Sequence, residues 1–343
     1  MHDKPKAMVL ASFAADSLAL GVHWIYNTGV IDKKFGRVER FIKPERPTYH
    51  PTKDLGEFTH YGDQSLILLE SVSERNRFDL SDFSDRWQKL FTTYDGYVDG
   101  ATKGTLENLA SGISPSESGS DSDDLAGASR IAALVYVYRN DLPTLIAAAK
   151  AQTAFTHNHE TVIESAAFFA TITFRILTGT SPTAAIEQVL KEVQPSTSVS
   201  EWIQMGLASV AQNSRQAISD FGQMCETPVA FPGVIHLIAK YETDLKTALI
   251  ENGMAGGDSA GRGLLVGMVL GAYLGLEAIP NFSVCARGTS PVESAKRWSI
   301  TTVNVPIALP ASSCVGRRAS PQAASCSTAA SETSTWRGPI TAG

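Results

Sequence analysis

Hydrophobic residues recur at helical spacing along most of the chain, and short polar segments separate the runs. Between residues 81 and 91, for example, Phe83, Trp87, Leu90 and Phe91 lie three or four positions apart and form one apolar face. The alternating pattern of strands is scarce, so the sequence predicts an all-α domain of about a dozen helices. We expect helices over residues 7–26, 102–109, 125–138, 161–177, 200–212, 234–241, 244–252 and 259–275, and helices that begin at Asp63, Ser81, Asp141 and Ser181.

Two stretches lack this periodicity. Residues 31–58 contain Pro44, Pro47 and Pro51, which is typical of a long surface loop. From residue 281 onward the chain is rich in Ser, Ala, Thr, Arg and Pro and has no continuous apolar face. We therefore expect a helical domain over residues 1–280 and an irregular or disordered tail over 281–343. Because the change in composition is abrupt, a shifted reading frame is one hypothesis for the tail.

Residues 252–275 combine a glycine-rich loop with an apolar helix. Glycines at 263, 267, 271 and 275 are four apart, so they lie along one helix face and allow another helix to approach closely. We expect this helix at the centre of the fold. The preceding loop brings Asp258 to the helix start, where unpaired backbone N–H groups favour anions. A helix N-cap would also explain Asp258.

Composition and charge narrow the function classes. The net charge is −6 and the pI about 5.7, so no global basic field attracts nucleic acid or an anionic membrane. The apolar helix is too short to span a bilayer. The four cysteines show neither a disulfide framework nor zinc-site spacing, and Asp16 and His23 interrupt the first helix in a way that is unlike a signal peptide. We expect a cytoplasmic protein without nucleic-acid or membrane partners; the oligomeric state is not predicted.

Several polar residues lie in or beside apolar helices and are candidates for a functional site. A carboxylate in an apolar helix, such as Asp16, is costly unless it is paired, hydrogen-bonded or bound to a cation. Asp63 lies in the polar segment 57–65, where it could bind a ligand or cap a helix. Arg130 follows an acidic run that is typical of a solvated loop, and it could pair with a phosphate. His157 and His159 are two apart, which disfavours a helical zinc pair; one could line a pocket.

The order of these motifs resembles the ADP-ribosylglycohydrolase family, and more closely its crystallin J1-like branch, over about residues 5–280. The family's Gly-Asp near the first helix matches Ala15-Asp16. Its Thr-Asp-Asp-Thr motif aligns with Tyr61-Gly62-Asp63-Gln64, and its late Asp-Thr-Asp-Thr motif with Asp258-Ser259-Ala260-Gly261. Each of these two motifs keeps one carboxylate here. The resemblance implies an all-α domain whose central cleft holds two Mg²⁺ ions and ADP-ribose.

The resemblance also implies a hydrolase that cleaves an ADP-ribosyl or related ribosyl bond in a protein or small molecule. With fewer carboxylates, we expect one Mg²⁺ ion rather than two, held by Asp63 and Asp258 converging on one cleft. The predicted site residues are Glu57 and Asp63 for catalysis, and Asp16, Arg130, His157, Gly256, Gly257 and Ser259 for substrate binding. Two alternatives stay open: a non-catalytic ADP-ribose-binding or crystallin-like structural protein, and a metal-independent nucleoside-type hydrolase.

Overall fold

The computed structural model describes residues 3–280. Within these residues the structure is helical; two isolated β-bridges occur and no β-strand does, which confirms the all-α prediction. The tail over 281–343, and with it the reading-frame hypothesis, lies outside the described residues. The helices are α1 (Lys4–Ala19), α2 (Thr28–Phe35), α3 (His60–Arg75), α4 (Leu80–Phe91), α5 (Gly100–Ala110), α6 (Ala126–Ser129), α7 (Ala132–Val137), α8 (Leu142–Ala154), α9 (Glu160–Leu177), α10 (Pro182–Glu192), α11 (Thr197–Ala208), α12 (Ser214–Phe221), α13 (Thr227–Lys240), α14 (Leu245–Met254), α15 (Ser259–Leu274) and the 3-10 helix η1 (Leu276–Ala278).

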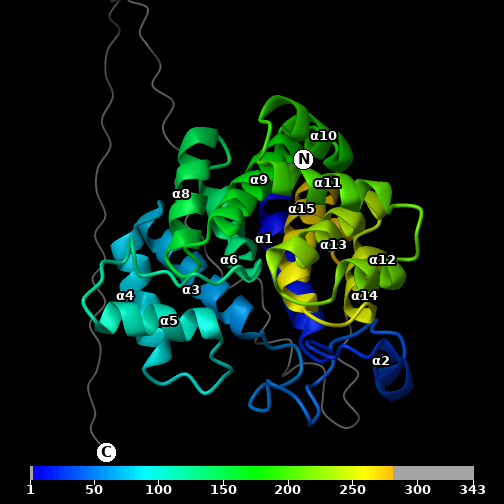
Figure 1. Cartoon of the computed structure of the whole chain (residues 1–343), viewed down its shortest axis with the longest axis horizontal. Helices are drawn as coiled ribbons and strands as arrows, with labels where there is room; N and C mark the ends of the chain where they lie inside the picture. Colours follow the sequence, from blue (N-terminus) through cyan, green and yellow to red (C-terminus); the bar gives the residue numbers. More distant parts are fainter. Residues whose placement is uncertain (1–2, 281–343) are drawn as a thin grey trace, which may run out of the picture. The chain divides into compact units, whose positions relative to one another are not determined.

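Helices α1 and α15 lie side by side at the centre of the described unit, with the other helices around them (Figure 1). The glycine ridge of α15 makes this contact possible. A Cβ atom added at Gly267 would lie 2.3 Å from the carbonyl oxygen of Ala11, and one at Gly271 would lie 2.7 Å from Ala11 Cβ. Ser12 Oγ also donates a hydrogen bond to Leu264 O at 2.8 Å. The predicted central helix is therefore confirmed, and the ridge fixes how closely it approaches α1.

Several helix starts differ from the sequence prediction. Thr59, not Asp63, caps α3, because its side-chain oxygen accepts from the Tyr61 amide. Asp79 likewise caps α4 in place of Ser81. Helix α2 over residues 28–35 overlaps the start of the loop predicted over 31–58, and Asn27 caps this helix. In each case a side chain one or more residues upstream reaches the free amides, which the apolar pattern does not reveal.

Three further differences concern a helix that is divided, a helix that was not predicted and a helix that begins earlier than predicted. The helix predicted over 125–138 is two short helices, α6 and α7, with Arg130 and Ile131 between them. Helix α12 is missing from the prediction, and α13 begins at Thr227 rather than at residue 234 and contains Pro232. The break after α6 matters most, because it places Arg130 inside the domain rather than along a continuous helix.

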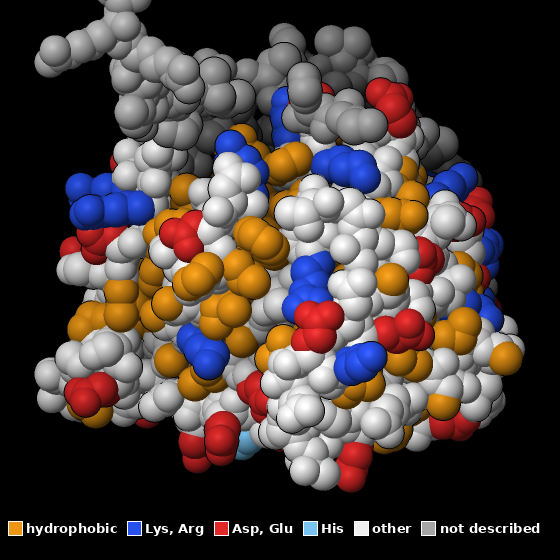
Figure 2. Space-filling view, turned by 90° about the horizontal axis from the view of Figure 1, so that it is seen from above, with side chains coloured by type: hydrophobic (Ala, Val, Ile, Leu, Met, Phe, Trp, Pro, Cys, Tyr) orange, Lys and Arg blue, Asp and Glu red, His pale blue; other side chains and the backbone are white. Residues whose placement is uncertain are grey.

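The surface drawn in Figure 2 shows acidic and basic side chains interspersed with hydrophobic ones, without a large area of one charge. No helix among residues 3–280 combines the length and apolar character that a membrane span requires.

Candidate active site

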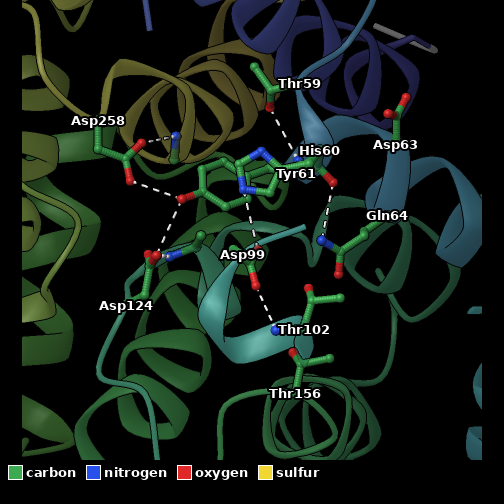
Figure 3. A network of polar contacts seen from close by, with 12 residues as sticks. Thr59, His60, Tyr61, Asp63, Gln64, Asp99, Thr102, Asp124, Thr156 and Asp258 are labelled. Atoms are coloured by element: carbon green, nitrogen blue, oxygen red, sulfur yellow. Dashed lines mark hydrogen bonds and ion pairs between the residues drawn. The ribbon is translucent and has the colours of Figure 1, made fainter. Parts of the chain in front are cut away.

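The hydroxyl of Tyr61 lies between two aspartates that come from distant parts of the chain (Figure 3). Its oxygen is 3.2 Å from Asp124 Oδ2 and 3.3 Å from Asp258 Oδ2. A phenol can donate only one hydrogen bond. Both contacts are satisfied together when one carboxyl is protonated and donates to the phenol oxygen, while the other is ionised and accepts from the hydroxyl. The geometry therefore suits a pair of carboxyl groups that holds one proton.

The electrostatics of the pair agree with this proton count. Burial raises the pKa of Asp258, and burial together with the charge of Asp258 raises the pKa of Asp124 well above its ordinary value. The Cys225 thiol hydrogen-bonds to Asp124, and burial raises the pKa of this thiol, so it stays neutral. One ligand atom from each of these three residues lies within 4.8 Å of the others. Two like charges this close are unfavourable in a buried site, so we expect one proton on the pair near neutral pH.

Two backbone hydrogen bonds hold the loop that carries Asp124. Leu125 N donates to Cys225 O at 2.9 Å, and Thr227 N donates to Asp123 O at 2.9 Å, which ties this loop to the segment before α13. The carboxylate of Asp124 also accepts from Ala126 N at 2.8 Å. The side chain is thus oriented by its own loop.

Asp258 is fixed by the glycine loop and by helix α15. Its carboxylate accepts from Gly261 N at 2.9 Å, so the N-cap expected as an alternative is present. Gly256 and Gly257 have φ angles of +69° and +63°, and a Cβ at Gly257 would lie 2.1 Å from Gln223 O. Only glycine fits there. The loop therefore delivers Asp258 in a defined direction.

Asp63 and Asp258 are not brought together. Asp63 Oδ2 accepts hydrogen bonds from Lys53 Nζ and from Tyr94 Oη, each at 2.5 Å, and Figure 3 shows its side chain directed away from Tyr61 and Asp258. Among residues 3–280, Asp63 belongs to neither of the two groups of three or more side chains that could share a metal ion. The carboxylate that lies near Asp258 is Asp124, which the sequence gives only as part of an acidic loop.

Glu57 and Asp16 both accept hydrogen bonds from the chain segment that leads into α3. Glu57 accepts a hydrogen bond from the Asp54 amide at 2.8 Å within the loop before α3. Asp16 is buried and accepts from Thr59 N at 2.8 Å and from Thr59 Oγ1 at 2.6 Å. A Cβ at Gly62 would lie 2.4 Å from Asp16 Oδ2, so glycine is required at this approach. These contacts hold the start of α3, which carries Tyr61.

Arg130 and His157 lie in a second buried network beside the carboxyl pair. Arg130 donates to Gln64 and, at 2.5 Å, to Thr156 Oγ1, which is 2.9 Å from His157 Nδ1. Burial lowers the pKa of His157 to about 3, so it is neutral at physiological pH. Both terminal nitrogens of Arg130 thus have internal partners, whereas its Nε is buried without one.

The glycine loop is also occupied by internal hydrogen bonds. The amides of Gly256 and Gly257 donate to Gly253 O and Ile25 O, at 3.1 and 3.0 Å. Ser259 Oγ, by contrast, is buried without a hydrogen-bond partner. Of the predicted substrate-binding groups in this loop, only Ser259 has an unused polar atom.

Oxygen ligands of the kind that Mg²⁺ prefers meet at the carboxyl pair. Asp124, Asp258 and the Tyr61 hydroxyl offer three oxygens, and burial raises the pKa of both carboxyl groups, although the charge of Arg262 opposes this shift at Asp258. At Asp63, the ammonium of Lys53 already supplies a positive charge. The residues therefore suit a divalent cation at the pair of Asp124 and Asp258 rather than at Asp63, and the number of ions stays a prediction.

The fold and this site define an all-helical protein with a pair of carboxyl groups, one buried and one partly buried, at the start of its central helix. The chain belongs to the ADP-ribosylglycohydrolase family, whose family model matches residues 1–297, past the domain boundary predicted at residue 280. Members of this family act on ADP-ribosylated substrates and generally use divalent metals. The family resemblance seen in the sequence is thereby confirmed.

The chain is also similar to individual proteins. It is 24% identical over 314 residues to crystallin J1A of Tripedalia cystophora, covering 87% of this chain and 96% of that protein. It is 23% identical over 274 residues to an uncharacterised protein of Archaeoglobus fulgidus, covering 79% and 88%. A solved structure described as an ADP-ribosylglycohydrolase-related protein complex matches with a TM-score of 0.66 at 21% identity, covering 81% of this chain and 90% of that one. The last similarity concerns the fold alone.

Proposed function

We propose that this chain hydrolyses a ribosyl glycosidic bond, in an ADP-ribosylated protein or small molecule or a related riboside, at the pair Asp124 and Asp258. The observation that carries the proposal is the Tyr61 hydroxyl between the carboxyl group of buried Asp258 and that of partly buried Asp124. Glycosidases use two carboxyl groups in different protonation states, one as general acid and one as base or nucleophile. A pair that shares one proton supplies both states near neutral pH.

The separation of the two groups favours direct attack by a carboxylate. Their nearest oxygens lie within 4.8 Å. This is close to the roughly 5–5.5 Å of retaining glycosidases and below the roughly 6.5–9.5 Å that leaves room for an attacking water. The protonated carboxyl gives its proton to the leaving group as the glycosidic bond breaks, and the carboxylate forms an ester with the anomeric carbon. Water then cleaves that ester and returns the proton to the pair.

A neighbouring cavity is a suitable place for the substrate. It has a volume of about 540 Å³, and its lining includes His23, Trp24, Tyr26 and Tyr49. Aromatic rings of this kind suit a nucleobase or the apolar face of a sugar. His23 connects the cavity to the pair, because its Nδ1 is 3.7 Å from Asp258 Oδ1. A divalent cation held by Asp124, Asp258 and Tyr61 would take the place of the shared proton and would polarise a ribose hydroxyl near this cavity, so hydrolysis is measured with and without Mg²⁺.

A non-catalytic ADP-ribose-binding or structural role is the second candidate. It is favoured by Asp63, which lies at the position of the family's metal motif and here forms an ion pair with Lys53 at 2.5 Å. Similarity to crystallin J1A points the same way. In this case the carboxyl pair would serve only to join the loop of Asp124 to helix α15.

Hydrolysis assays with and without Mg²⁺ separate the two candidates. The wild-type chain should release ADP-ribose or ribose from ADP-ribosylated protein or a small-molecule riboside. Asp124→Asn and Asp258→Asn should each lower the rate by about 10²–10⁴-fold, the usual contribution of an acid or base. Asp121→Asn, an exposed change in the same acidic run, is the matched control and should leave the rate unchanged.

The sequence-based assignments of Glu57 and Asp63 stay predictions, and the same assay tests them. Glu57→Gln and Asp63→Asn should retain activity if the contacts described above are their main role. A loss as large as that of Asp124→Asn would restore them to the catalytic centre. Binding of ADP-ribose by calorimetry, without turnover of any substrate class tested, would refute the hydrolase and support the non-catalytic candidate.

A further inference from the structure

Three buried histidines from separate parts of the chain meet beside the carboxyl pair. His23 follows α1, His50 belongs to the irregular segment before α3, and His60 is the first residue of α3. Their side chains are at most 4% exposed, and one ring nitrogen of each lies within 4.8 Å of the others. The cluster is distinct from the group formed by Asp124, Cys225 and Asp258.

The nitrogens in this cluster lack the partners that buried polar atoms normally have. His23 Nε2 and both nitrogens of His50 and of His60 have no hydrogen-bond partner, although His60 Nε2 lies 3.3 Å from Asp99 Oδ2. An unpaired polar atom in a buried position is unfavourable. Other buried histidines are satisfied: His236 contacts Ser209 and Ser214 through its two nitrogens. Unpaired nitrogen atoms therefore gather where the three imidazole rings meet, which is a pattern typical of a ligand-binding site.

Ring geometry and protonation both suit a metal ion. The ring centroids of His50 are 5.4 Å from those of His23 and 5.5 Å from those of His60, and His23 and His60 are 6.3 Å apart. A tetrahedral ion with Zn–N bonds of about 2.1 Å holds imidazole centroids roughly 5 Å apart, so a small inward shift is sufficient. Burial lowers the pKa of His23 and lowers that of His50 to about 3, so both rings are neutral. Neutral imidazole is the form that binds metals.

Carboxylates lie behind two of the three rings. Asp99 Oδ2 is 3.3 Å from His60 Nε2, and Asp258 Oδ1 is 3.7 Å from His23 Nδ1. In metalloproteins a ligating histidine commonly donates its second N–H to such a carboxylate, which fixes its tautomer. This arrangement leaves His60 Nδ1 and His23 Nε2 for the ion. In this tautomer His23 Nδ1 carries a proton, so it no longer accepts the 3.3 Å hydrogen bond from the Ala260 amide.

We propose that His23, His50 and His60 form a binding site for one divalent transition-metal ion of the Zn²⁺ class. Nitrogen ligands favour Zn²⁺, Co²⁺, Ni²⁺ or Cu²⁺ over Mg²⁺, so this ion differs in chemistry from the one that fits the carboxyl pair. The cavity that His23 and Trp24 line gives an ion a route to the cluster. The proposal goes beyond the ribosyl-hydrolase function and does not depend on it.

The test uses the full chain, stripped of metal, and Co²⁺ as the probe. Titration should give one ion per chain with the visible absorption of tetrahedral Co²⁺, and Zn²⁺ should displace it. His50→Phe keeps a ring between His23 and His60 while removing both nitrogens, and it should weaken binding by more than about 100-fold. His50→Asn provides a second variant should the larger ring not be accommodated. Circular dichroism should verify that each variant is folded.

Two further variants identify the ligands. Asp99→Asn, which can still cap α5, should weaken binding by about 10–100-fold because it removes the carboxylate behind His60. His159→Ala, a change at a partly exposed histidine outside the cluster, should leave affinity unchanged. The proposal is overturned by the absence of saturable Co²⁺ binding, or by folded His50 variants that bind as the wild type does. Loss of binding in Cys225→Ser but not in His50→Phe would also overturn it, by placing the ion on Asp124, Cys225 and Asp258.

Discussion

The buried carboxyl of Asp16 offers a quantitative test of how the start of α3 is held. Asp16 lies in the middle of α1, is fully buried and accepts two hydrogen bonds from Thr59. Burial raises its pKa from 3.8 to about 7, against the opposing effect of those hydrogen bonds. The folded chain therefore binds this proton more tightly than the unfolded chain. Its contribution to stability is fully present below about pH 4 and is lost as the pH rises through about 7.

The size of the effect follows from the two pKa values. At 1.36 kcal/mol per pH unit, the difference between 3.8 and about 7 corresponds to about 4 kcal/mol, and about 3 kcal/mol of this is lost between pH 4.5 and pH 8. Because Asp16 is fully buried, solvent screening does not reduce this figure. Asp16→Asn removes the titration and keeps an acceptor for the Thr59 amide. The free energy of unfolding of wild type minus that of the variant should therefore fall by about 3 kcal/mol over this pH range.

Urea unfolding followed by circular dichroism at pH 4.5 and pH 8 measures this difference. Asp82→Asn is a control, because the pKa of Asp82 is shifted in the opposite direction from that of Asp16. Hydrogen bonds from Arg75, opposed by burial, lower the pKa of Asp82 to about 2. Its stabilisation is present above about pH 4 and is lost only as the pH falls through 2, so its effect should be the same at both pH values. A wild-type minus Asp16→Asn difference that does not change between pH 4.5 and pH 8 would refute the reasoning.

Two further predictions concern the central helix and the carboxyl pair. Gly267→Ala should lower the free energy of unfolding by about 1–3 kcal/mol, because the added methyl group meets a backbone carbonyl of α1. Gly100→Ala is the control: no atom lies within 4 Å of the added methyl group, so this change should be neutral or slightly stabilising. Equal urea midpoints for Gly267→Ala and wild type would contradict the close packing of α1 and α15. Tyr61→Phe removes the hydroxyl between the two carboxyl groups and should lower kcat and shift the pH profile of hydrolysis. An unchanged profile would show that the hydroxyl does not take part in sharing the proton.

The predicted enzymatic site changes in one essential respect. The sequence predicts that Asp63 lies beside Asp258. In the structure, Asp63 accepts hydrogen bonds from Lys53 and Tyr94, and Asp124 lies near Asp258. On a helix, residues two apart lie on different faces. Tyr61 and Asp63 therefore cannot both face Asp258, and it is Tyr61 that does so. The hydrolase proposal accordingly rests on Asp124 and Asp258.

The sequence by itself determined the features that depend on local pattern. Helical periodicity predicted an all-α domain, the four-residue glycine spacing predicted a central helix in close contact with another, and the motif order predicted the family. Asp258 before an apolar helix was recognisable as both a cap and a candidate site residue. These properties can be read along the chain because each follows from residues within a few turns of one another.

Only the tertiary structure decided which polar side chains meet. Asp124 and Cys225 are far apart in sequence, and no local signal pairs them with Asp258; the same holds for His23, His50 and His60. The loops of Asp124 and Cys225 are joined by backbone hydrogen bonds, such as the one that Leu125 N donates to Cys225 O. The protonation of these groups was equally hidden, because it is burial, a property of the packed domain, that shifts their pKa values.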